Sequence, residues 1–120
     1  MENKPEKEVI LFPLIDNNGL DSKISLHFGH APFLGIYNTE RKELKVVDNK
    51  LDHGNTQKSP IKQIKEKYNP AIIFAREMGR RAISEISNLD IQLKTGNFVS
   101  IKEAINNLNE LEDLTQSCDH

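Results

Sequence analysis

The sequence is very poor in cysteine, because Cys118 is the only one among its 120 residues. A single thiol cannot form a disulfide within the chain, and this usage fits a reducing compartment. A long apolar run is also missing. The longest one, residues 9–15, contains Pro13 and falls far short of the ~20 residues that a membrane span needs. The charged N-terminus has no cleavage site of the signal-peptide type. These absences predict a cytoplasmic protein with no membrane partner.

An excess of charge of one sign is absent as well. The 16 Lys and Arg residues nearly balance 18 Asp and Glu residues, which gives a formal net charge of −2. A weakly acidic chain has no overall electrostatic attraction to nucleic acid, so we expect no nucleic-acid partner. The length suits one folded domain with a single core. We expect a disordered lead-in over residues 1–8 and a flexible C-terminal tail over residues 115–120.

The spacing of the apolar residues predicts the order of elements. Strands are expected at 8–15, in a hairpin over 33–49, at 71–75 and at 90–96. Helices are expected from Ser59-Pro60 to Tyr68, over 77–89, and after the Ser100–Glu103 capping box. Strand–helix–strand steps require parallel pairing with right-handed crossovers. The sequence therefore predicts an α/β fold with a mixed sheet of about five strands and helices on its faces.

The stretch "SLHFGHAPF", Ser25 to Phe33, is the first candidate site because it holds two of the four histidines. In such sheets, ligands collect beyond the carboxyl ends of the parallel strands. The first strand leads toward this stretch, and the strand at 71–75 leads into "REMGRRA" at a helix start. If these strands are neighbours, one crevice collects His27, His30, Arg76, Gly79, Arg80 and Arg81. Arginines and helix N-terminal amides attract anions, so the crevice suits an anionic ligand that also accepts imidazole coordination.

Plainer interpretations of the same residues remain open. A lone H-x-x-H is a weak motif, and adjacent arginines usually mark the solvated face of a surface helix. Cys118 and His120 form a C-x-H tail, but chain ends are more often disordered than ligating. A closed structural zinc site needs four nitrogen or sulfur donors, which this chain could gather only from distant segments. We therefore expect no structural zinc.

The stretches "ILFPLID" and "GLDSKISLHFGHAPFLGIYN", with the closing helix "VSIKEAINNLNELEDL", resemble the dinitrogenase iron–molybdenum cofactor family. The resemblance covers residues 9–114, which we take as the domain. It implies a ribonuclease-H-like fold. It also implies binding of an iron–sulfur or molybdenum–iron–sulfur cluster, which members hold or pass on without catalysis. The histidine of H-F-G, His27, is then the main cluster contact, together with Phe28 and Gly29.

Three departures from the family pattern concern this site. His30 stands where an arginine is usual, which removes a cation and adds a second possible metal ligand. The loop "DHGNTQKSP" has one glycine where many members are glycine-rich. The stretch "AREMGRRA" keeps Gly79 but adds Arg76, Arg80 and Arg81. The cargo therefore need not be the nitrogenase cofactor itself. Cys118 is a further possible metal ligand, because thiolates favour iron–sulfur sites.

Three functions compete at this point. The first is a carrier or assembly chaperone for a metal–sulfur cluster, with cluster donor and acceptor proteins as partners. The second, a nuclease, needs clustered carboxylates for two-metal chemistry, and we reject it because only Asp16 and Asp21 lie near the expected strand ends. The third is a regulatory module that binds a small phosphate-type anion at residues 79–81, for which His27 would be dispensable. No set of nucleophile, base and orienting residue is recognisable, so we expect no enzyme.

Overall fold

The computed structural model describes residues 9–51, 54 and 57–114. The predicted lead-in at 1–8 and tail at 115–120 lie outside these residues, and so do Cys118 and His120. No helix in the described part is long and apolar enough to cross a membrane.

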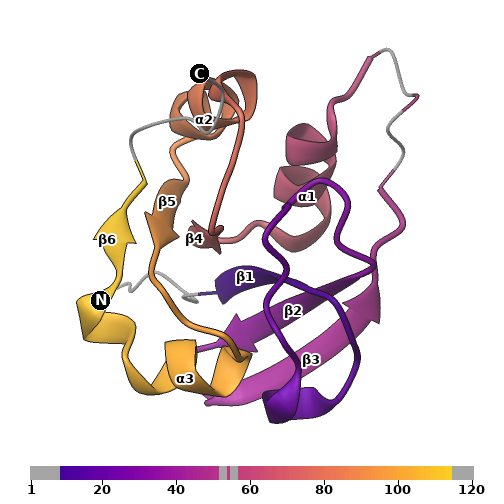
Figure 1. Cartoon of the computed structure of the whole chain (residues 1–120). Helices are drawn as coiled ribbons and strands as arrows, with labels where there is room; N and C mark the ends of the chain where they lie inside the picture. Colours follow the sequence, from indigo (N-terminus) through magenta and orange to yellow (C-terminus); the bar gives the residue numbers. More distant parts are fainter. Residues whose placement is uncertain (1–8, 52–53, 55–56, 115–120) are drawn as a thin grey trace, which may run out of the picture.

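A six-stranded mixed sheet forms the centre of the fold, in the order β3-β2-β1-β4-β5-β6 (Figure 1). Its strands are β1 (Val9–Leu14), β2 (Phe33–Asn38), β3 (Glu43–Asp48), β4 (Ile72–Phe74), β5 (Gln92–Thr95) and β6 (Glu112–Asp113). The strands β1, β4 and β5 are parallel, whereas β2 and β3 form the expected antiparallel hairpin next to β1. The predicted mixed α/β fold is therefore confirmed, and the ribonuclease-H-like description fits it approximately.

The sheet has one strand more than the expected number of about five. The additional strand, β6, pairs antiparallel with β5 at the edge of the sheet. Its two residues, Glu112 and Asp113, are charged and exposed, so no apolar alternation indicates a strand there. The backbone N–H of Leu114 donates to the carbonyl of Leu93 at 3.1 Å and continues the pairing.

The helices cover both faces of the sheet. They are α1 (Pro60–Tyr68), α2 (Arg80–Asn88) and α3 (Ile101–Asn106). Figure 1 shows α1 and α2 on one side and α3 on the other. Because side chains alternate along a strand, those of β1 pack into two hydrophobic clusters, one on each face of the sheet. Leu11 packs in the cluster beneath α1 and α2, whereas Phe12 and Leu14 pack in the cluster with Ile101 of α3.

The predicted helix at 77–89 begins three residues later than expected. Met78 is buried in the core before the helix starts, and Gly79 takes the N-cap position with extended backbone angles. Glu77 forms a parallel bridge with His27 and so remains extended. The closing helix, expected over residues 99–114, is shorter than predicted: α3 ends at Asn106, and a 3-10 turn at Leu108–Glu110 and β6 follow it. The predicted bounds of α1 are confirmed. Ser59 caps α1, and α1 stops at the left-handed Asn69, just before Pro70.

Candidate functional site

The site lies where the loops after β1 and β4 meet. These two strands are parallel neighbours, with Ile10 opposite Ile72 and Leu11 opposite Ile73. Their carboxyl ends therefore deliver the following loops to the same edge of the sheet, as expected for a ligand site in this class of fold. Beyond the strands, His27 and Glu77 form an isolated parallel bridge. The two loops predicted to meet are therefore neighbours in the structure.

A buried serine holds the histidine loop in place. Ser25 is 6% exposed, and its backbone N–H donates to the carbonyl of Pro13 in β1 at 2.8 Å. Its hydroxyl accepts from the N–H of His27 at 3.2 Å and donates to the carbonyl of His27 at 3.0 Å. The Phe28 ring then enters the core beneath α1 and α2. These contacts fix the backbone of His27, whose own side chain remains 72% exposed.

Together the segments line a groove of about 520 Å³. This volume falls within the ~300–1,000 Å³ that is usual for ligand pockets. The lining comprises residues 27–30, 59–61 and 77–79, together with Arg81, Ala82 and Glu85. Phe28, Ile61 and Met78 make the floor apolar, because all three belong to the core cluster. We call this feature the histidine groove.

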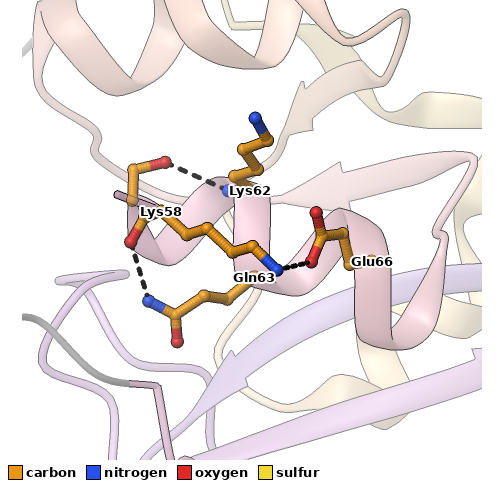
Figure 2. Close-up of polar contacts among 5 residues, drawn as sticks. Lys58, Lys62, Gln63 and Glu66 are labelled. Atoms are coloured by element: carbon orange, nitrogen blue, oxygen red, sulfur yellow. Dashed lines mark hydrogen bonds and ion pairs between the residues drawn. The ribbon is translucent and has the colours of Figure 1, made fainter. Parts of the chain in front are cut away.

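Two helices begin at the histidine groove. The first turn of α1 is well anchored, because Ser59 accepts from the N–H of Lys62. Gln63 also donates to the carbonyl of Lys58, as Figure 2 shows. Lys58 also donates to Glu66 at 2.7 Å, which lowers the pKa of that carboxyl. The start of α2 has no side-chain cap and no acidic residue in its first turn. Two helix N-termini at one groove favour an anionic occupant.

The three arginines predicted at this site separate in the structure. Arg81 lines the histidine groove. Arg80 lines an adjoining polar cavity of about 770 Å³, which also includes Arg81, Ser84 and Asn88. Arg76 does not line the groove. Its guanidinium donates instead to Asn97 Oδ1 at 2.9 Å and to the carbonyl of Phe98 at 3.4 Å. The cationic contribution to the groove is therefore smaller than the sequence indicated.

Two carboxylates in the groove were not identified from the sequence. Glu77 Oε1 lies 4.0 Å from His27 Nδ1, which is beyond hydrogen-bond distance, and both side chains are exposed. Glu85 accepts a hydrogen bond from the Ser59 hydroxyl and so connects α2 to the start of α1. The only signal for Glu85 was its helical spacing of four residues from Arg81. Nothing in the sequence indicated that Glu77 would pair with the first loop.

Comparison with known proteins assigns the fold to a family. Residues 9–111 match the family described as dinitrogenase iron-molybdenum cofactor. The chain belongs to this family. A comparison with curated proteins gives no match.

Solved structures of similar fold span nearly the whole chain. The crystal structure of PH0822 is 25% identical with a TM-score of 0.73, covering 88% of this chain and 96% of its own. A candidate NifB protein from Thermotoga is 24% identical with a TM-score of 0.77, covering 94% and 98%. The apo form of the orange protein from Desulfovibrio gigas is 14% identical with a TM-score of 0.75, covering 92% and 96%. At these identities, the latter two support the fold alone.

The described part of the chain gathers few metal-ligating side chains in one place. Among the described residues, no three His, Cys, Asp or Glu side chains are grouped so that they could hold a metal ion. The histidine groove offers His27 and His30, both exposed and separated by Phe28 and Gly29. Leu114, the last described residue, pairs beside Leu93, and β6 runs antiparallel to β5. The described chain therefore ends toward the opposite end of the sheet from His27.

Proposed function

We propose that the chain is a non-catalytic carrier or assembly chaperone for an anionic metal–sulfur cluster, either iron–sulfur or molybdenum–iron–sulfur. The cargo would lie in the histidine groove with His27 as its main contact. The observation that carries this proposal is the position of His27, at the mouth of an apolar groove where two helices begin. Membership of the dinitrogenase iron-molybdenum cofactor family supports this choice of cargo.

Each lining group has a role in this proposal. The Nε2 atom of His27 would coordinate the cluster, and His30 would act as a second contact from the other end of the loop. Arg81 and the first-turn amides of α2 would balance the negative charge of the cargo. One or two imidazoles hold a metal less firmly than a full set of four ligands. Loose coordination suits a protein that must release its cargo to an acceptor.

An anaerobic titration of the cargo-free protein tests the proposal. Iron–sulfur and molybdenum–sulfur clusters would be added while visible absorption is followed, for the wild type and for His27→Ala. We expect stoichiometric uptake by the wild type and at least tenfold weaker uptake by His27→Ala. Lys102→Ala serves as a control, because Lys102 is exposed on α3 across the sheet. Absence of uptake by the wild type would overturn the proposal.

Further variants assign the remaining contacts in the same titration. His30→Ala measures the second imidazole, and Glu77→Gln measures the carboxylate next to His27 Nδ1. Loss of an outer-shell partner typically weakens metal binding ~10–100-fold. Cys118→Ser determines whether the thiol contributes at all.

The alternative function, binding of a small phosphate-type anion, is favoured by the polar cavity next to the groove. Its lining consists of two cations, Arg80 and Arg81, one carboxylate, Glu85, and the polar side chains of Ser59, Ser84 and Asn88. The two functions predict opposite rankings of variants. Binding of inorganic phosphate that is lost in Arg80→Ala and Arg81→Ala but kept in His27→Ala would favour the alternative.

A further inference from the structure

The outer edge of β3 is an unpaired side of the sheet. This strand pairs with β2 along all six of its residues, and no described strand pairs with its other side. An edge strand presents a row of N–H and C=O groups that can pair with another chain. Val46 and Val47 are half-buried, whereas Lys45 is exposed. The edge therefore offers both backbone pairing and a partly apolar surface.

A basic hollow lies beside this edge, between β3 and the end of α1. It has a volume of about 480 Å³ and is lined by residues 45–48, Lys50, Lys67 and Tyr68. Lys67 Nζ lies 5.7 Å from the centre of the Tyr68 ring. Lys45, Lys50 and Lys67 are exposed, and Asp48 is the single acidic residue in the lining. The hollow is therefore predominantly cationic.

The charge of the chain is distributed unevenly around this region. Residues 40–68 contain eight Lys and Arg against five Asp and Glu, whereas the rest of the chain contains eight against thirteen. An acidic protein thus carries a basic region along the hairpin and α1. Complementary charge steers association and selects partners.

We propose that the edge of β3 docks an acidic, extended segment of a partner protein, which adds to the sheet as a seventh strand. Main-chain hydrogen bonds would supply affinity, while acidic side chains facing Lys45, Lys50 and Lys67 would supply specificity. An acidic peptide fits this surface better than a nucleic acid does, because only a peptide satisfies the N–H and C=O groups of the strand edge. Lysine on an edge strand also discourages aggregation, and that role alone would require no partner.

The end of β3 is connected to the histidine groove. The Asn49 side chain donates to the carbonyl of Ala31 at 2.7 Å, and the Asn49 N–H donates to the carbonyl of Pro32 at 3.0 Å. Ala31 directly follows His30 in the groove-lining loop. A segment docked on β3 would therefore lie close to this loop. The partner that docks here would then be a protein that donates a cluster to the groove or accepts one from it. This identification of the partner rests on the proposed function.

The docking is tested on the cargo-free protein by ¹⁵N NMR with a synthetic peptide of alternating valine and glutamate. We expect chemical-shift changes centred on residues 44–48 and Tyr68, together with slower amide exchange along β3. Lys45→Glu should weaken binding at least fivefold, because it places like charges side by side. Lys102→Glu makes the same charge change on α3 and should leave binding unaltered. Circular dichroism confirms that both variants are folded.

Several outcomes would overturn the inference. These are no shift at β3 with millimolar peptide, equal weakening by Lys102→Glu, or equal binding of a peptide with lysine in place of glutamate. A DNA oligonucleotide that produces the same shifts more strongly would show a general polyanion surface instead. None of these measurements involves a cluster, so failure of the docking is distinguishable from failure of the carrier function.

Discussion

At the scale of single residues, the site was partly predictable. The H-F-G-H loop follows an apolar strand, so its position at the sheet edge could be derived from topology alone. The direction of Arg76 could not, because it depends on Asn97 and Phe98, which are more than twenty residues away in sequence. Glu77 was missed for a similar reason, since its pairing with His27 is a long-range contact. Sequence patterns indicate local periodicity, but they do not show which loops that are distant in sequence come into contact.

Gly35 lies where β2 meets the core beneath α3. An added Cβ would come within 2.9 Å of Ile101 Cδ1 and within 2.9 Å of Leu14 Cδ1. Both neighbours are fully buried, so neither can move aside easily. Gly35→Ala should lower the free energy of unfolding by ~1–3 kcal/mol, as overpacking of a core does. Urea denaturation measures this. Ser84→Ala is the control, because Ser84 is an exposed residue within α2. Equal stability of the two variants would contradict the prediction.

Ionisation of Tyr68 makes the stability of the folded protein depend on pH. Burial raises the pKa of its hydroxyl above the ordinary value of 10.0. The folded state therefore binds this proton more tightly than the unfolded state does. Its contribution to stability is complete below about pH 10 and is lost as the pH rises through the folded-state pKa. Between about pH 9 and pH 11, the free energy of unfolding should fall less for Tyr68→Phe than for the wild type. Chemical denaturation at both pH values measures this. An identical loss in both proteins would refute the assignment.

At the scale of elements, capping signals were the most reliable part of the sequence. Ser59 and the Ser100–Glu103 capping box begin α1 and α3 as predicted. The start of α2 was placed too early because Met78 continues the apolar spacing of the helix although it lies before it. The strand β6 was missed because its pairing with β5, and not its own composition, makes it a strand. Local chemistry thus predicts helix starts better than edge strands.

Ser59 links two elements through one hydroxyl. It accepts from the N–H of Lys62 at 3.1 Å as the cap of α1 and donates to Glu85 of α2. Ser59→Ala removes both bonds and should lower the free energy of unfolding by ~1–2 kcal/mol. Ser84→Ala, an exposed serine on α2, should change it by less than ~0.5 kcal/mol. Chemical denaturation of both variants measures the difference. Ser59→Thr keeps a hydroxyl and should recover most of the stability.

At the scale of the whole molecule, the sheet order makes β1 the most protected element. It is hydrogen-bonded to β2 on one side and β4 on the other, and five of its six residues are buried. The edge strand β6 has two exposed residues. Native-state hydrogen exchange should therefore show the slowest exchange for the amides of β1 and the fastest strand exchange in β6. Exchange of β1 amides ahead of those of β5 would contradict this order.

The floor of the histidine groove is also part of the main core. Phe28 and Met78 line the groove, and both pack in the cluster beneath α1 and α2. Any molecule that binds the folded groove therefore shifts the folding equilibrium, by ~2.7 kcal/mol when its free concentration is one hundred times its Kd. The protein with bound ligand then has the higher free energy of unfolding, and the ligand-free protein has the larger unfolded fraction. Cellular proteolysis, which acts on unfolded chains, would consequently remove empty molecules first and spare those that carry a ligand.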